Sequence, residues 1–146
     1  MGNFEHGQEL LDYLTGQMGC PSVKWDENQA AGLDADGMSF LFYLADTAGV
    51  LVTTIYMGQP DLDDAALLQE ILESNHFGEK TGGGSLSLDE ETGHLCLCHQ
   101  LRLPLEEPAQ LEVAWAPLIG AARYWKKKLE QAAHGNPSPA GGMVSV

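Results

Sequence analysis

The sequence has few basic residues and no long apolar run. Only 7 of its 146 residues are lysine or arginine, against 21 aspartates and glutamates, so the net charge is −14. This charge repels the phosphates of nucleic acids and anionic lipids, and we expect neither as a partner. No segment reaches the roughly 18 apolar residues of a membrane span, and the N-terminus lacks the basic and apolar blocks of a secretory signal. These absences predict a protein that is not inserted into a membrane.

Cysteines and catalytic motifs are scarce as well. The three cysteines form an odd set without a secretory signal, which is typical of free thiols in a reducing, cytoplasmic compartment. The five histidines are scattered, and the sequence contains neither the Gly-x-Ser-x-Gly elbow of hydrolases nor a phosphate-binding loop. We therefore expect a protein that is not an enzyme, with no catalytic residues and no bound cofactor.

The run His-Leu-Cys-Leu-Cys-His at residues 94–99 is the main candidate for a metal or redox site. His94, Cys96 and Cys98 alternate, so on a strand they share one face at spacings of about 6 to 7 Å. Zinc ligands must converge to about 2.0–2.3 Å from one point, which successive positions on a flat strand rarely do. The Cys-x-x-Cys spacing of redox pairs is also missing. We expect no metal, and thiols that fill a half-buried strand face under a helix or against another subunit.

The first half of the chain predicts one helix and three strands. Residues 3–18 carry apolar side chains at helical spacing, and Asn3 is suited to cap the helix. Residues 29–35, 38–45 and 50–57 are short strand-like runs separated by the turn signals DADG and DTAG. Such short turns favour an antiparallel meander, and we expect its weak first strand to be an exposed edge.

The second half predicts a helix over residues 61–75 and a hairpin. The helix begins at three aspartates, where the helix dipole favours negative charge: Asp61, Asp63 and Asp64. The alternating runs 84–88 and 94–103 predict two strands joined by the loop DEETG. The glycines at 82–84 are expected to give the first of these strands a flexible entry.

A last helix is predicted for residues 108–133. Pro108 suits its first turn, whereas Pro117 lies inside the pattern and is expected to kink the helix. The order helix, three strands, helix, two strands, helix predicts an α+β domain with a twisted antiparallel sheet. We assign this domain to residues 1–134 and a flexible C-terminal tail to residues 135–146.

The segment from residue 67 to residue 105 resembles a known family. It reads LLQEILESNHFGEKTGGGSLSLDEETGHLCLCHQLRLPL. The sequence of its helix resembles the family's pattern of paired leucines followed by an asparagine. The sequence of its hairpin resembles the family's pattern L.LD..TG.L.L...LPL. The last helix is similar to A..W...L, here Ala121 or Ala122, Trp125 and Leu129. In order and spacing, residues 3–132 resemble the class I type III secretion chaperones, the CesT-like or Tir chaperone family.

The resemblance implies a cytoplasmic homodimer without enzymatic activity. Such a protein binds the N-terminal segment of a secreted effector in extended form and keeps it competent for export. The family's dimer is built around the second helix and the neighbouring strand, which here implies Leu68, Ile71, Leu72, Leu86 and Leu88. Its effector lies on apolar patches of the first helix and the sheet.

A peptide that adds a strand to an exposed sheet edge places alternate side chains in apolar pockets. Combined with the resemblance, this predicts the partner-binding residues Leu10, Leu14, Leu33, Phe40, Phe42 and Leu44. A plain hydrophobic core would contain the same side chains, so both interpretations stay open.

Two alternatives of other classes also stay open. Non-secretion proteins of the YbjN type share the fold, which leaves a regulatory or adaptor protein with no export role. A small thiol or metal protein built on Cys96 and Cys98 is the other alternative. The negative charge likewise has two interpretations, a device for solubility or an attraction for basic segments of the partner.

Overall fold

The computed structural model describes residues 2–45, 49–76, 78–105, 107 and 109–135, and within these ranges the side chains of residues 8–132. In chain order the elements are α1 (Gly2–Gln17), β1 (Ala30–Ala35), β2 (Met38–Ala45), β3 (Val50–Gly58), α2 (Ala65–Ser74), the 3-10 turn η1 (Glu79–Thr81), β4 (Ser85–Leu88), β5 (Leu95–Arg102) and α3 (Ala109–Gly135). The predicted order of helices and strands is therefore confirmed. No helix within the described ranges is long and apolar enough to cross a membrane.

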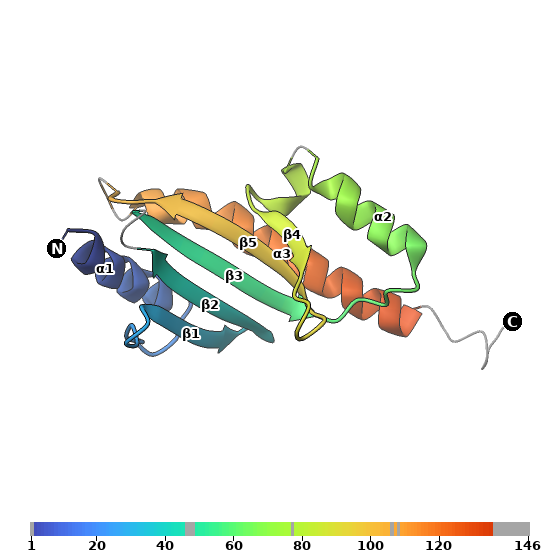
Figure 1. The fold of residues 1–146 in the computed structure, drawn as a ribbon, viewed down its shortest axis with the longest axis horizontal. Coiled ribbons are helices and arrows are strands. Elements are labelled where there is room, and N and C mark those ends of the chain that lie inside the picture. Colours follow the sequence, from blue (N-terminus) through green and yellow to red (C-terminus); the bar gives the residue numbers. More distant parts are fainter. Residues whose placement is uncertain (1, 46–48, 77, 106, 108, 136–146) are drawn as a thin grey trace, which may run out of the picture.

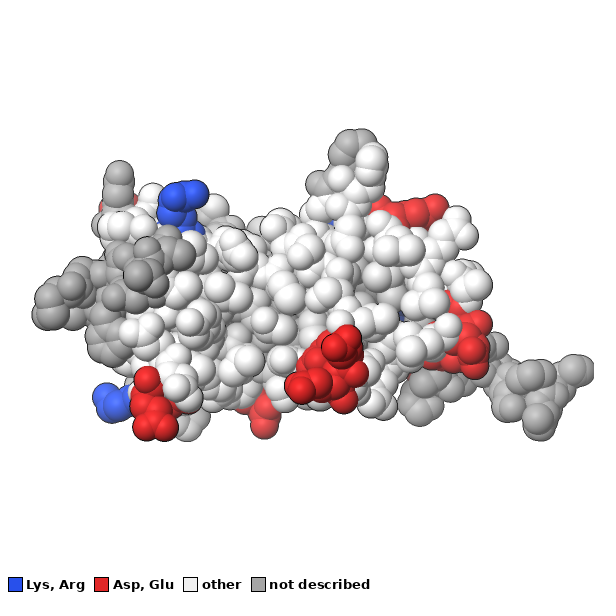
Figure 2. All heavy atoms as spheres, in the orientation of Figure 1, with Lys and Arg blue, Asp and Glu red and all other residues white. Residues whose placement is uncertain are grey.

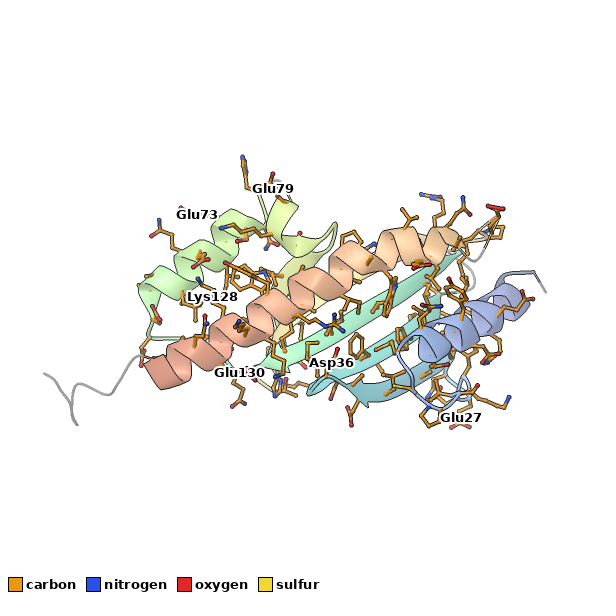
Figure 3. The ribbon with its side chains drawn as sticks, turned by 180° about the vertical axis from the view of Figure 1, so that it is seen from behind. Glu27, Asp36, Glu73, Glu79, Lys128 and Glu130 are labelled. Carbon is orange, nitrogen blue, oxygen red and sulfur yellow. The ribbon has the colours of Figure 1, made fainter. Side chains whose placement is uncertain are left out.

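The five strands form one antiparallel sheet in the order β1-β2-β3-β5-β4. Helices α1 and α3 cover one face of this sheet, and α2 lies beside β4 (Figures 1 and 3). The opposite face, called the open face below, is covered by no helix of the described residues (Figure 1). The α+β architecture with an antiparallel sheet is thus confirmed, and β1 is one of the two sheet edges.

The hydrophobic core lies between the sheet and the helices α1 and α3. Side chains alternate along β2, so that Phe40 and Phe42 are at most 2% exposed, whereas Leu41 between them faces the open side. Trp115 of α3 stacks on both phenylalanines, with ring centroids 6.0 and 5.5 Å apart. This period-two alternation is why strand residues that look uniformly apolar divide between a core and a surface.

Two helices begin at positions that differ from the prediction. Asn3 lies inside α1 rather than before it. Helix α2 begins at Ala65, because the Asp64 side chain accepts a hydrogen bond from the Leu67 N–H at 3.0 Å and so caps the first turn. Asp61 instead forms a turn ahead of the helix, accepting from the N–H of Asp63 at 2.9 Å. The aspartates therefore divide between a turn and a cap.

Helix α3 runs continuously through Pro117 to Gly135 (Figure 3). A proline leaves the carbonyl four residues earlier without its helical donor. That carbonyl belongs to Val113, which is 76% exposed, so water can satisfy it. The helix therefore tolerates the proline on its solvent side. Pro108 and most of the predicted tail, residues 136–146, lie outside the described residues.

The glycines expected to be a flexible entry to β4 are instead sites of close packing. A Cβ on Gly82 would lie 2.3 Å from the carbonyl oxygen of Pro117, and one on Gly84 would lie 2.5 Å from that of Cys98. Gly82 also has a left-handed φ of 60°. The segment before β4 is therefore packed against α3 and β5.

The outer edge of β4 is covered by the side chain of Asn75. Its amide nitrogen donates to the carbonyl of Leu86 at 3.0 Å, and its amide oxygen accepts from the Leu86 N–H at 2.8 Å. The amide thereby replaces the neighbouring strand that an edge residue lacks. The asparagine that follows the paired leucines thus covers the Leu86 position of this sheet edge.

Asn75→Ala is expected to lower the free energy of unfolding by about 1–3 kcal/mol, because it leaves both main-chain groups of Leu86 without a partner. Urea denaturation followed by circular dichroism measures the loss. Gln69→Ala is the control, since the Gln69 side chain is exposed on the same helix and bonds only Glu73 at 3.0 Å. Equal effects of the two substitutions would contradict the edge-capping role of Asn75.

Candidate functional site

The other sheet edge, β1, leaves part of its backbone uncovered. The Leu44 N–H donates to the Gln29 carbonyl at 2.9 Å, and hydrogen-bonded pairs alternate along an antiparallel ladder. Ala31 and Leu33 therefore direct their main-chain groups toward β2. Ala30, Gly32 and Asp34 direct theirs away from the sheet.

Asp26 covers the first of these outward positions. Its own N–H donates to the Ala30 carbonyl at 2.8 Å, and its carboxylate accepts from the Ala30 N–H at 3.0 Å. Gly32 and Asp34 follow along the strand, and within the described residues no partner is recorded for their outward main-chain groups. We call the backbone of Gly32 and Asp34 the free edge.

The open face beside the free edge is poor in charge. Leu41 and Tyr43 of β2 are 41% and 47% exposed there, and Val52, Thr54 and Tyr56 of β3 are half-buried. Figure 2 shows mostly uncharged atoms over the middle of this face, with acidic side chains along the rim where β1 lies. An apolar sheet surface thus adjoins an edge able to accept another strand.

A cavity of about 450 Å³ lies on the helical side, between α1, α3 and the β1–β2 turn. Its apolar lining includes Leu14, Met18, Trp115 and Ile119. The indole nitrogen of Trp115 is buried without a hydrogen-bond partner. The cavity therefore has an apolar lining, and the indole N–H of Trp115 beside it is available to donate a hydrogen bond.

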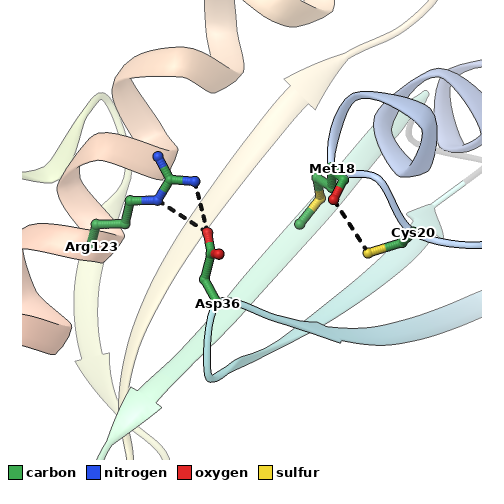
Figure 4. Close-up of polar contacts among 4 residues, drawn as sticks. All are labelled: Met18, Cys20, Asp36 and Arg123. Atoms are coloured by element: carbon green, nitrogen blue, oxygen red, sulfur yellow. Dashed lines mark hydrogen bonds and ion pairs between the residues drawn. The ribbon is translucent and has the colours of Figure 1, made fainter.

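Two polar pairs border this cavity. Arg123 of α3 donates from Nε and Nη2 to one carboxylate oxygen of Asp36 at 3.1 and 2.7 Å (Figure 4). The Tyr13 hydroxyl donates to Glu112 at 3.1 Å, and this hydrogen bond raises the pKa of Tyr13. All four side chains reach solvent, where water competes for their polar groups and weakens both the ion pair and the hydrogen bond. The pairs can therefore open at little cost.

The predicted partner-binding residues lie almost entirely in the core. Five of the six are at most 3% exposed, namely Leu10, Leu14, Phe40, Phe42 and Leu44. Leu33 of β1 is half-buried against the same core. Only Leu14 among them lines the cavity. Their burial agrees with the alternative that they are core residues, and their contact with a partner stays a prediction.

The predicted dimer residues divide between surface and core. Leu72 of α2 and Leu88 of β4 are 72% and 45% exposed, Leu68 is half-buried, and Ile71 and Leu86 are each 6% exposed. The exposed pair comes from neighbouring elements at the side of the molecule opposite β1 (Figure 1). Pairing between two copies through these side chains stays a prediction.

The cysteine strand β5 has the predicted alternation. Leu95 and Leu97 are fully buried toward the helices, while Cys96 and Cys98 lie on the open face. Helices α1 and α3 lie on the other side of the sheet, so they do not cover the thiols, and contact of this face with another subunit stays a prediction. The described residues contain no cluster of three or more potential metal ligands.

Cys96 is expected to react with iodoacetamide more slowly than Cys20 and Cys98 in the folded protein at mildly alkaline pH. Its side chain is 2% exposed, and burial, followed by the neighbouring Cys98, raises its thiol pKa to about 11. The reactive thiolate is therefore rare below that pH and increases as the pH approaches it. Peptide mass spectrometry of timed samples measures the three rates. Equal rates in the folded protein would contradict this environment, whereas equal rates in guanidinium chloride are expected.

Sequence reasoning missed the residues that border the cavity and the free edge. The ion pair of Asp36 and Arg123 joins positions 87 residues apart, so no local pattern predicts it. Leu41 was detectable in principle, since an alternating strand whose outer positions are also apolar leaves those positions on a surface. Gly32 was noted only as part of a weak strand.

Chains with the same fold occur in the ExsC–ExsE complex (22% identity, 88% of this chain and 97% of the other, TM-score 0.74). Others occur in the HopA1–SchA chaperone–effector complex (17%, 86% and 95%, TM-score 0.67). A third match is the Yersinia pestis type III secretion chaperone SycH with a fragment of YscM2 (21%, 80% and 97%, TM-score 0.60). At these identities the likeness shows the fold alone.

No curated protein sequence matches the chain significantly. The sequence profile of the Tir chaperone protein (CesT) family, in contrast, matches residues 9–126. That range includes the free edge, the cavity and all five strands. The resemblance carried by residues 67–105 is thereby confirmed, and the chain belongs to the Tir chaperone protein (CesT) family.

Proposed function

We propose that this protein is a cytoplasmic type III secretion chaperone that binds the N-terminal segment of an effector in extended form and keeps it competent for secretion. The family match over residues 9–126 carries this proposal. The likeness to chains from the HopA1–SchA chaperone–effector complex supports it. A chaperone of this kind acts by binding and needs no catalytic group.

The free edge of β1 supports an extended mode of binding. Its outward main-chain groups, at Gly32 and Asp34, would pair with those of an added strand. The Asn75 side chain occupies the outward main-chain groups of Leu86 on the short β4 edge, so β1 is the edge of the described sheet that offers two successive free positions to a client segment. The cavity between α1 and α3 would take an apolar side chain from a later part of the same client.

The acidic surface suits a client with basic segments. The chain carries a net charge of −14, and acidic residues flank β1. Opposite charges across an interface speed association and help select the partner. An affinity that falls as salt is added would support this role of the charge, and an affinity independent of salt would leave solubility as its role.

We further propose that two copies pair through α2 and β4. Leu72 and Leu88 would be the central contacts, because they are the predicted interface residues that are exposed in the single chain. Burying large exposed leucines favours association at roughly 25 cal/mol per Å² of apolar area.

Leu72→Asp is expected to convert the dimer to a monomer while leaving the fold intact, since the side chain is 72% exposed and makes no core contact. Analytical ultracentrifugation measures the mass, and circular dichroism checks the fold. Leu62→Asp is the matched control, because Leu62 is 56% exposed but lies outside the predicted interface. A monomeric wild type, or a Leu72→Asp variant that remains a dimer, would contradict the interface.

The chaperone function is tested by a tagged pull-down from the native host under secretion-inducing conditions. Limited proteolysis and mass spectrometry then map the protected part of whatever is captured. The expected result is one protein protected over a continuous stretch near its N-terminus. A folded partner protected nowhere near its N-terminus would instead favour a regulatory or adaptor role.

A further inference from the structure

We propose that the free edge of β1 selects a segment with one large apolar side chain and, two residues away, a lysine or arginine. The inference rests on the proposed function and adds the chemistry of the recognised segment. It is carried by the juxtaposition of Gly32, Leu41 and Asp34 at the uncovered edge of the sheet.

The direction of the outward backbone groups determines on which face of the sheet the client side chains lie. An added strand of either direction hydrogen-bonds to the outward main-chain groups of Gly32 and Asp34, and the client residues beside these two place their side chains on the same face. For these two residues that is the open face, since Gly32 is opposite Leu41 and Asp34 is opposite Ser39 in the ladder. The client side chains opposite the free edge therefore lie away from α1 and α3.

Gly32 leaves space for a large side chain. It has no left-handed φ, and a Cβ added to it would meet only the Phe40 carbonyl at an ordinary 3.5 Å. Neither the backbone nor packing in the single chain therefore requires glycine at this position. Without a side chain here, Leu41 and Tyr43 remain 41% and 47% exposed.

A bulky client residue opposite Gly32 reaches over the glycine and covers Leu41. Cross-strand contacts with large apolar side chains stabilise a sheet more than contacts with small ones, and an aromatic neighbour compensates for an edge glycine. An alanine at the same client position is too short to reach Leu41. The free edge thus distinguishes client segments by the size of one side chain.

Asp34 supplies the negative charge that selects the basic residue of the client. Its side chain is exposed, and one of its carboxylate oxygens accepts from the Ser39 hydroxyl at 2.7 Å. Figure 3 shows Glu27 and Asp36 at the two ends of β1, so carboxylates extend along this edge. Strand residues two apart share a face, so a client cation opposite Asp34 lies two positions from the apolar residue. Direct pairing with a carboxylate favours lysine or arginine there and disfavours glutamate.

The test uses the full chain and the fluorescein-labelled probe peptide Ser-Thr-Lys-Thr-Phe-Thr-Lys-Thr-Ser. Its central motif reads the same in both directions, so the orientation of the added strand does not matter. Two further peptides replace the phenylalanine by alanine or both lysines by glutamate. Fluorescence anisotropy is expected to show about tenfold weaker binding for each, which corresponds to about 1.4 kcal/mol.

Gly32→Val fills the space over Leu41 with a side chain compatible with a strand. It is expected to reduce the preference for the phenylalanine peptide over the alanine peptide from about tenfold to less than about twofold. Gln100→Val is the matched control, because it adds the same side chain to an exposed position of β5 on the same face, away from β1. This control should keep the tenfold preference, and thermal unfolding checks that both variants fold.

Three results would overturn the inference: no binding of the phenylalanine peptide, equal binding of the phenylalanine and alanine peptides, or an unchanged preference in Gly32→Val. The pull-down separates these from a failure of the chaperone function. If the wild type captures a client protected near its N-terminus while any of the three results holds, the chaperone function stands and the selection at Gly32 is wrong. If the peptides behave as expected but no such client is captured, the edge selects its motif and the secretion role fails.

Discussion

Phe42→Ala is expected to lower the free energy of unfolding by about 3–5 kcal/mol. The side chain is fully buried, and its ring stacks on Trp115 at 5.5 Å and on Phe40 at 6.4 Å. The substitution removes these contacts and leaves a cavity beneath α3 that the sheet cannot close. Urea denaturation followed by tryptophan fluorescence measures the loss, since Trp115 reports directly on this part of the core.

Tyr43→Ala is the matched control for Phe42→Ala. Tyr43 is the next residue of the same strand, but it is 47% exposed on the open face, so its loss is expected to cost less than about 1 kcal/mol. The comparison also tests whether Phe42, one of the predicted partner-binding residues, acts as a core residue or as part of a client pocket. A Phe42→Ala variant of unchanged stability that no longer binds its client would contradict the core assignment and favour a client pocket at Phe42.

Gly82→Ala is expected to destabilise the protein by about 2–5 kcal/mol. Two effects add, because the residue has a φ of 60° and its Cβ would lie 2.3 Å from the carbonyl oxygen of Pro117 and 2.8 Å from the Cα of Leu118. These atoms belong to the backbone of α3, so no side-chain rotation relieves the overlap. The loop must withdraw from α3, which also weakens the 3.0 Å hydrogen bond from Trp125 Nε1 to the Lys80 carbonyl.

Gly120→Ala controls for the addition of a methyl group. Gly120 lies inside α3, and a Cβ there would have no heavy atom within 4 Å. Alanine is the better helix former, so this variant is expected to gain about 0.5–1 kcal/mol. Denaturant midpoints of the two variants should therefore move in opposite directions. A Gly82→Ala midpoint equal to that of the wild type would show that the loop is not held against α3.

Local chemistry made the strands, hairpins and helices predictable. The Asp36-Gly37 pair, with φ values of 56° and 74°, forms the tight turn that the DADG signal predicts. Gly93, with a φ of 74°, takes the left-handed conformation expected for the loop between β4 and β5. The chain's membership in a family of chaperones also confirms the expectation that it is not an enzyme. These features depend on residues close together in the chain.

The functional surface was less predictable, because apolar patterns do not say which apolar residues meet a partner. Phe40 and Phe42 suit both a partner pocket and a plain core on their sequence, and in the structure α3 covers them through Trp115. Leu41, with the same chemistry and the neighbouring position, remains 41% exposed. The period-two alternation of the strand places Phe40 and Phe42 on one face of the sheet and Leu41 on the other. Only the position of the helices determines which of these faces is covered.

The sequence by itself determined the order of the elements, the antiparallel hairpins, the negative charge and the family, because each is written in local spacing or composition. Only the tertiary structure decided that Asn75 covers the Leu86 position of the β4 edge, that Asp26 covers Ala30, and that Gly32 and Asp34 remain uncovered. Those outcomes depend on contacts between segments that the fold brings together. A main-chain group is free or paired according to what packs beside it, and no residue carries that information alone.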